Sequence, residues 1–389
     1  MPKRRRPPAD TPTPPAAGLY APALKTGVQA TTTRVQEMHH AIAGKTFDTL
    51  QKVPGLALPT RAVQGAHDAI ANGVYAAVRH GAAALLSLAG QAEQRISDPA
   101  RMPKGKELAI RSALNGVFGD ALQAQGSALA VTMGFHSADA PLPLTRAALA
   151  GLGERVCVFV HGLACDERSW FRSGSESYGS LLAADLGITP IYLRYNTGLP
   201  VADNGQQFAA LLQQFVRLAP RRLRELVLVG HSMGGLVARD ACERAAVDAS
   251  PWLDRVTMVV CIGSPHQGSP IEQVGRLAAG TLDLFKVTQP LARVANARSQ
   301  GIKDLRHGRR GQANVVPLRF IAGSLADEAD GLVATAVGKL LGDGLVTRHS
   351  ASDDGLGGDV ERVELEGIGH MTLLSHPRVY AELRAWLER

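Results

Sequence analysis

The stretch that most constrains the fold of this chain is Leu226–Val237, with the sequence LVLVGHSMGGLV. Its apolar run, Leu226–Val229, predicts a buried strand, and apolar residues at helical spacing resume after the glycines. Between them lies Gly230–Gly234, which has the pattern G-x-S-x-G. In that context the serine occupies a strained strand-to-helix turn that exposes its Oγ at the carboxyl edge of a sheet. We therefore expect Ser232 to be a nucleophile.

Apolar runs alternate with helical stretches through the rest of the second half of the chain. Helices are expected over Gly205–Leu218 and Gly235–Ala246, and a short edge strand over Leu129–Met133. Near-continuous apolar strands that alternate with helices are typical of a mostly parallel sheet covered on both faces, which is an α/β fold. The main predicted strands are Val156–Val160, Ile191–Tyr195, Leu226–Val229, Val256–Ile262, Leu318–Ala322 and Val360–Leu365.

The first part of the chain has a different character. Residues 1–22 are basic and rich in proline, so we expect a disordered tail. Residues 23–125 form a predicted helical region, and residues 126–389 the α/β domain. The helical region is either an accessory domain packed on the α/β domain or an amphipathic segment that meets a lipid surface or an apolar substrate. Its predicted helices are Thr26–Val53, Thr60 to about residue 96, and Lys106–Ala124.

Composition excludes several classes of function. The formal net charge is +7, but aromatic residues make up only 5% and no basic stripe is interleaved with them, which argues against nucleic-acid binding. The four cysteines lack metal-ligand spacing and are too few for a disulfide scaffold, so they favour a reducing compartment. Prolines follow the basic residues Lys3–Arg6 where a signal peptide would be apolar. We expect a cytoplasmic protein without an integral membrane segment.

A serine nucleophile needs a base, and an orienting carboxylate for that base. His370 directly follows the last predicted strand and is the expected base. His231 in the turn and His307 in a loop are expected to be structural, and His376 to cap the final helix. Asp343, between two glycines after the penultimate strand, is the expected acid.

Asp327 is the main rival for that role, and Asp330 lies nearby. The developing oxyanion also needs two donors. The backbone N–H of Met233, next to the nucleophile, is the expected first donor. The second is the N–H of Leu163, in the loop after the strand Val156–Val160.

Two further segments are expected to border the substrate. Trp170 follows the predicted oxyanion loop, and His266 follows the strand beside that of the nucleophile, where a purely structural turn is the alternative. Residues 270–317 form a long insertion with an amphipathic start, which favours either a mobile lid or a fixed cap. No metal ligands or cofactor motif accompany these residues, so neither a metal nor a cofactor is expected.

From about Arg155 to its end, the chain resembles serine esterases and lipases of the α/β-hydrolase superfamily. The resemblance rests on five motifs: His161-Gly-Leu163, Gly230–Gly235, Gly263–Gly268, Asp343–Val346 and Gly369-His370. Within the superfamily it is most similar to bacterial proteins with a GPI inositol-deacylase-like domain. The chain order Ser232, Asp343, His370 is the one that this fold requires. One departure is that the first strands of the usual sheet are short or missing.

The resemblance implies hydrolysis of carboxylic esters through an acyl-enzyme on Ser232, with lipid-like substrates. A thioesterase, an amidase or an acyltransferase would use the same residues, and a non-catalytic scaffold is the alternative from another class. The expected partner is a small-molecule or lipid ester. Peripheral contact with lipid and the oligomeric state are left open.

Overall fold

The computed structural model describes residues 20–52, most of 57–75, 106–171 apart from 125 and 139, 176–268, 299–307, 315–324, 343, 346–347, 350–351, 353 and 356–389. Most of the predicted tail, the predicted helix beyond residue 75, and most of the 270–317 insertion lie outside these residues. The chain divides into two compact units, Met1–Met102 and Pro103–Arg389.

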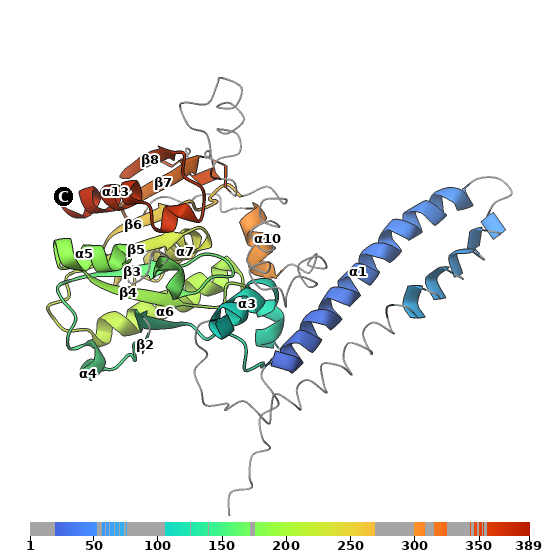
Figure 1. Ribbon diagram of the computed structural model, residues 1–389, viewed down its shortest axis with the longest axis horizontal. Coiled ribbons are helices and arrows are strands. Elements are labelled where there is room, and N and C mark those ends of the chain that lie inside the picture. Colours follow the sequence, from blue (N-terminus) through green and yellow to red (C-terminus); the bar gives the residue numbers. More distant parts are fainter. Residues whose placement is uncertain are drawn as a thin grey trace, which may run out of the picture. The chain divides into compact units, whose positions relative to one another are not determined.

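The first unit contains a helical hairpin. Helix α1 (Tyr20–Gln51) has 32 residues, so it includes the last three residues of the predicted tail. Gln36 of α1 donates to Asn72 at 2.6 Å, whereas Gln51, at the end of the helix, donates to Gln64 at 2.8 Å. Residues later in α1 therefore bond to residues earlier in the second segment. The helical residues between 57 and 75 thus run antiparallel to α1 (Figure 1).

The second unit is built on one eight-stranded sheet with the order β2-β1-β4-β3-β5-β6-β7-β8 (Figure 1). Strand β1 pairs antiparallel with β2 and β4, and every other neighbouring pair is parallel. The predicted fold class is therefore confirmed. The strands are β1 (Gly134–Ser137), β2 (Ala140–Pro141), β3 (Arg155–Val160), β4 (Thr189–Arg194), β5 (Glu225–His231), β6 (Val256–Ile262), β7 (Leu318–Ser324) and β8 (Val360–Glu366).

The predicted edge strand Leu129–Met133 is wrong, because the first strand begins only at residue 134. The backbone of the apolar run bonds to side chains of helix α3 (Lys106–Ala124) instead of to a neighbouring strand. Asn115 donates to the carbonyl of Leu129 at 2.7 Å and accepts from the N–H of Val131 at 2.9 Å. Burial without a strand partner thus explains the apolar pattern.

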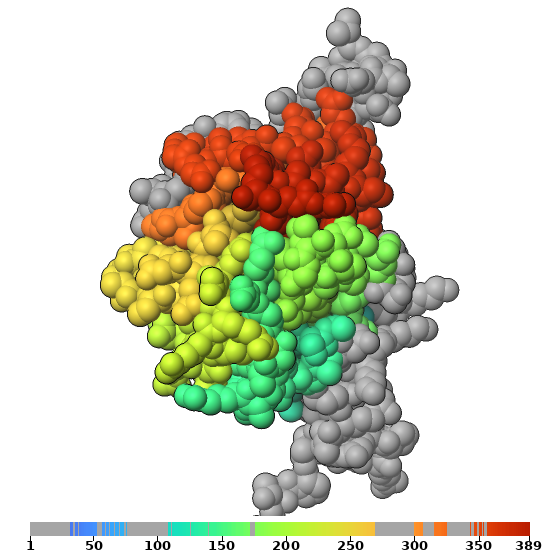
Figure 2. Space-filling model, turned by 90° about the vertical axis from the view of Figure 1, so that its left-hand side faces the viewer, coloured from blue at the N-terminus to red at the C-terminus, as the bar shows by residue number. Residues whose placement is uncertain are grey.

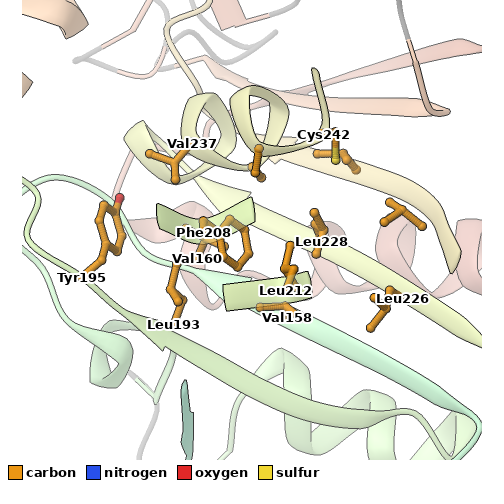
Figure 3. Close-up of a cluster of buried hydrophobic side chains, with 14 of the residues drawn as sticks. Val158, Val160, Leu193, Tyr195, Phe208, Leu212, Leu226, Leu228, Val237 and Cys242 are labelled. Carbon is orange, nitrogen blue, oxygen red and sulfur yellow. The ribbon is translucent and has the colours of Figure 1, made fainter. Parts of the chain in front are cut away.

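Helices cover both faces of the sheet, and alternate residues of each strand point to opposite layers. Val158 and Val160 of β3 pack in one cluster with helices α6 (Val201–Leu218) and α7 (Met233–Val247), as Figure 3 shows. Phe159 packs in the other cluster with helices α5 (Tyr178–Leu186) and α13 (Pro377–Leu387). The helices are α4 (Arg146–Leu149), α5 (Tyr178–Leu186), α6 (Val201–Leu218), α7 (Met233–Val247), α10 (Gln300–His307) and α13 (Pro377–Leu387), with single turns η1 (Glu167–Phe171), η2 (Leu253–Arg255) and η3 (Thr372–Leu374).

Helices α5 and α13 lie side by side on one face of the sheet. The rings of Tyr178 and Tyr380 stack with centroids 6.2 Å apart, and the Tyr380 hydroxyl donates to Asp185 at 2.7 Å. Figure 2 shows a side of the molecule on which the red surface of the C-terminal segment borders green surface. His376 caps α13 by accepting from the N–H of Arg378, as predicted.

Helix α3 belongs to the second unit. The sequence places a boundary at residues 125 and 126, but α3 is bonded to the loops of the sheet on the far side of that boundary. Ser112 donates to Asp166 at 3.1 Å, and Asn196 donates to the carbonyl of Gly119 at 2.9 Å. The α/β unit therefore begins before α3.

None of the four cysteines forms a disulfide bond. Cys157, Cys242 and Cys261 are buried, and Cys165 is half-buried. Burial raises the pKa of the three buried thiols, to about 12 for Cys261. None of the described helices is both long enough and apolar enough to cross a membrane.

Candidate active site

Ser232 lies on a sharp turn between β5 and α7. Its backbone has φ 53° and ψ −123°, which is the left-handed side of φ that a residue with a Cβ rarely adopts. Its N–H donates to the carbonyl of Ile262 at 2.8 Å, and its carbonyl accepts from the N–H of Gly235 at 3.1 Å. These bonds hold the strained residue at the carboxyl edge of the sheet, where the sequence predicts it.

The glycines around Ser232 are required by close packing of the backbone. A Cβ on Gly230 would lie 2.3 Å from the nitrogen of Gly235. A Cβ on Gly234 would lie 2.2 Å from the carbonyl oxygen of Val160, at the end of β3. Atoms do not approach so closely, so a side chain at either position would open the turn.

His370 and Asp343 form a buried pair. The Nδ1 of His370 lies 2.7 Å from Oδ2 of Asp343, and both side chains are almost fully buried. The N–H of Val346 donates to the other carboxylate oxygen at 2.8 Å, and the N–H of His370 donates to the Asp343 carbonyl at 3.0 Å. A carboxylate at Nδ1 holds the proton on that nitrogen and leaves Nε2 as an acceptor.

The Nε2 of His370 is buried, and no group in the part of the chain that the structure describes bonds to it. The ring of His370 lies against that of His231, the residue before Ser232, with centroids 4.6 Å apart. His231 also bonds through its Nε2 to the His370 carbonyl at 3.0 Å. A Cβ on Gly263, after β6, would lie 3.1 Å from Oδ2 of Asp343 and 3.2 Å from Nδ1 of His370. Ser232, Asp343 and His370 follow β5, β7 and β8, so all three lie at the same carboxyl edge of the sheet.

His231 has a larger part in this site than the sequence indicates. From the sequence we expect His231 to be a structural residue of the turn. In the structure its side chain also bonds to and packs against His370, so it joins the serine turn to the loop that carries His370. A histidine inside the pentapeptide is the only sequence signal for this contact.

The two predicted oxyanion donors flank Ser232. A Cβ on Gly162 would lie 3.1 Å from the Cβ of Ser232, so the loop after β3 passes directly over the serine. Leu163 follows Gly162 in this loop, and Met233 is the first residue of α7, where a backbone N–H has no partner inside the helix. Among the hydrogen bonds of the described residues, neither of these two N–H groups donates to a protein acceptor.

Buried contacts fix the loop that carries Leu163. The hydroxyl of Tyr195 donates to the carbonyl of His161 at 2.8 Å, and the two rings stack with centroids 4.6 Å apart. The N–H of Ala164 donates to the hydroxyl oxygen of Thr197 at 3.0 Å. Burial lowers the pKa of His161, so its ring stays neutral near neutral pH.

The two residues predicted to border the substrate are fully buried. Trp170 packs edge-on against Phe159 with ring centroids 5.0 Å apart, inside the same core cluster as α5 and α13. His266 bonds to Arg239 at 2.8 Å, and Arg239 also donates to Asp353 at 2.9 Å. Both residues therefore have structural contacts, and their role in binding substrate stays a prediction.

No group of three or more histidine, cysteine, aspartate or glutamate side chains within the described ranges could hold a metal ion. Asp327 and Asp330, the rivals of Asp343, lie outside those ranges. The residues that the structure brings together are thus a serine on a strand-to-helix turn, a buried histidine–carboxylate pair and two backbone donors.

This architecture defines a class of protein: a parallel α/β sheet with a serine turn after β5 and a histidine after the last strand. A model of the alpha/beta hydrolase family matches residues 157–383, which is more than half of the chain. The protein belongs to the α/β-hydrolase family. The match supports a hydrolase, but it does not show the more specific resemblance to GPI inositol-deacylase-like proteins.

Several solved structures resemble this one. The mature form of a Bacillus licheniformis lipase is 19% identical, with 66% of this chain and 98% of that chain covered at a TM-score of 0.43. The thioesterase RedJ of Streptomyces coelicolor is 16% identical, with 65% and 95% covered at 0.42. A Pyrococcus furiosus esterase is 15% identical, with 61% and 82% covered at 0.42. Comparison with curated protein sequences finds no match.

Proposed function

We propose that this protein is a serine hydrolase that cleaves carboxylic esters through an acyl-enzyme on Ser232. The observation that carries the proposal is the buried pair of His370 and Asp343, with Nδ1 and Oδ2 2.7 Å apart, beside the strained turn that holds the serine. A carboxylate on Nδ1 is the arrangement that a histidine base needs.

In this mechanism Nε2 of His370 takes the proton of Ser232 while Oγ attacks the acyl carbon. The oxygen of the carbonyl becomes an oxyanion that accepts from the N–H groups of Leu163 and Met233. The bond to the alcohol then breaks, and His370 gives its proton to the departing oxygen. Water repeats the sequence on the acyl-enzyme, so the acid leaves and Ser232 regains its proton. Asp343 keeps the ring in one tautomer and stabilises its positive charge.

The lipid-like nature of the substrate is a separate part of the proposal. It is supported by the amphipathic start of the 270–317 insertion and by the resemblance of the motifs to those of lipases and GPI inositol-deacylase-like proteins. We propose that this insertion is a lid over the site and that the first unit, Met1–Met102, is an accessory region. The same site would also act on a thioester, because the acyl-enzyme step is unchanged.

The test is hydrolysis of p-nitrophenyl esters with acyl chains from acetate to palmitate. Wild type is compared with Ser232→Ala and with Ser250→Ala, a control serine three residues beyond the C-terminal end of α7. We expect Ser232→Ala to lose at least about a thousandfold in kcat and Ser250→Ala to behave as wild type. Activity that rises with chain length supports a lipid substrate, and activity confined to acetate and butyrate contradicts it.

A fluorophosphonate probe gives an independent measurement, since it modifies only an activated serine. Labelling at Ser232, located by peptide mass spectrometry, is the expected result. An unlabelled protein with full esterase activity in Ser232→Ala would refute the assignment. Oxygen esters, thioesters and amides of one acyl group, compared by kcat/KM, then decide between esterase, thioesterase and amidase.

A further inference from the structure

Helix α3 lies outside the stretch that the family model matches, yet it packs on the loop that carries Leu163. A Cβ on Gly116 of this helix would lie 2.6 Å from the Cβ of Ala164, 2.8 Å from its Cα and 3.0 Å from its nitrogen. Two of these three atoms belong to the backbone, so a rotamer change cannot relieve the contact. The absence of a side chain at residue 116 is therefore what lets the helix and the loop meet.

The conformation of Ala164 makes this contact sensitive. Its φ is 58°, in the left-handed region that alanine rarely adopts, and its N–H is held by the hydroxyl oxygen of Thr197 at 3.0 Å. Leu163, the proposed oxyanion donor, is the adjacent residue. A shift of the Ala164 backbone would turn the neighbouring peptide and move the Leu163 N–H away from the serine.

The helix itself is fixed on its other sides. The hydroxyl of Ser299 donates to the carbonyl of Gly116 at 2.6 Å, and the N–H of Gln300 donates to Asp120 at 3.0 Å. Asn115 is bonded to the backbone of residues 129 and 131. Because these contacts are buried or part-buried, the helix cannot simply retreat from a methyl group on residue 116, and the strain falls on the loop as well.

A second bond joins the helix to the same loop. The hydroxyl of Ser112 shares its proton between Oδ2 of Asp166 at 3.1 Å and the carbonyl of Leu108 at 2.9 Å, and both Ser112 and Asp166 are buried. Ser112 and Gly116 are four residues apart and therefore lie on one face of α3. Asp166 is two residues beyond Ala164. This face of the helix thus follows the loop from Ala164 to Asp166.

We propose that α3 is a positioning element of the catalytic site, which holds the Leu163–Ala164 loop in the conformation that stabilises the oxyanion. The proposal rests on the proposed function, because it assigns the helix a role in the same reaction. Gly116 sets the distance between the helix and the loop at Ala164. Ser112 holds the end of this loop at Asp166. Neither residue touches substrate.

The test is Gly116→Ala in the full-length chain, with Gly44→Ala as the matched control. Gly44 is also within a helix, and a Cβ there would meet nothing within 4 Å. We expect Gly116→Ala to lower kcat about 10- to 100-fold, which is less than the roughly 10²- to 10³-fold cost of removing an oxyanion donor because the donor is displaced and not removed. KM should change less than about threefold. Gly44→Ala should keep the wild-type kcat. Circular dichroism establishes that both variants are folded.

The pH profile separates this role from general damage to the site. Displacing a backbone donor changes neither the base nor its carboxylate partner, so the midpoint of kcat/KM against pH should stay in place while the plateau falls. A shifted midpoint, or a kcat equal to that of Gly44→Ala, overturns the proposal. If Gly116→Ala does not fold, Ser112→Ala replaces it, with an expected loss of at least about threefold in kcat and an unmoved midpoint. A wild-type kcat in Ser112→Ala would then overturn the proposal.

The two proposals fail in different ways. Wild type without Ser232-dependent turnover refutes the serine hydrolase and removes the basis of the role of α3. Active wild type with an unaffected Gly116→Ala variant refutes the role of α3 alone.

Discussion

Replacement of Asp343 by asparagine tests the role of this carboxylate as the group that orients His370 in the proposed mechanism. The two side chains have the same shape, but the amide has one oxygen where the carboxylate has two. In the structure both oxygens accept hydrogen bonds, Oδ2 from His370 at 2.7 Å and Oδ1 from the N–H of Val346 at 2.8 Å. Asparagine can satisfy only one of these donors.

The orientation of the asparagine amide decides whether the substitution lowers the catalytic activity or the folding stability. With its oxygen toward Val346, its NH₂ faces His370, so Nδ1 must accept and the ring proton moves to Nε2. That tautomer cannot accept the proton of Ser232, and losses of about 10⁴-fold in kcat, or about 5 kcal/mol of barrier, follow from such a change. The opposite orientation places two buried donors together, which costs about 1–3 kcal/mol of folding free energy. The first orientation avoids that cost, so we expect Asp343→Asn to lose activity and keep its stability.

The assay measures kcat and KM on one p-nitrophenyl ester beside thermal unfolding of the same preparation. Asp254→Asn is the matched control, because Asp254 is exposed in the short turn before β6. We expect a kcat about 10³- to 10⁴-fold below wild type with an unfolding temperature within a few degrees. The control should change neither quantity.

Asp343→Asn with more than about a tenth of the wild-type kcat would refute the reasoning. The orienting carboxylate would then have to come from elsewhere. Asp327 and Asp330, which follow the same strand in the sequence, would be the next residues to replace by asparagine.

Two further outcomes follow from burial. Iodoacetamide should alkylate Cys165 in the native protein and spare the three buried cysteines, whose thiol pKa is raised, and intact mass spectrometry that finds more than one adduct contradicts this. Burial raises the pKa of Asp166, but the bond and charge of Arg168 outweigh it and lower that pKa below 3.8. The carboxylate therefore adds stability above that pH and loses it as the pH falls further. The urea midpoints of wild type and Asp166→Asn should differ by a constant amount above about pH 5 and converge in acid; a pH-independent difference is the contrary result.

The strands could be predicted because the sheet is buried on both faces. In β3 every residue from Val156 to Val160 is buried, so the run is apolar without alternation. The serine turn could be predicted for a similar local reason, since the backbone approach at Gly230 and Gly234 leaves room for no other residue. Local sequence therefore contains both signals.

The role of α3 and the place of the first strand could not be predicted in this way. The contact between Gly116 and Ala164 joins residues that are 48 positions apart, and neither has a side chain that would indicate a partner. The apolar residues at 129–133 look like a strand because they are buried, but their backbone partners are side chains of α3. The pattern of apolar residues indicates which residues are buried. It does not indicate which group forms hydrogen bonds with their backbone.

The packing of α3 has a consequence for anyone who prepares the hydrolase unit as a separate protein. A fragment designed from the family match would start at residue 157, and one designed from the predicted boundary would start at residue 126. Both would omit the helix that covers Ala164 and that satisfies the backbone at residues 129 and 131. The shortest fragment that retains these contacts begins before Lys106, so the practical cloning boundary is set by a helix that the family description leaves out.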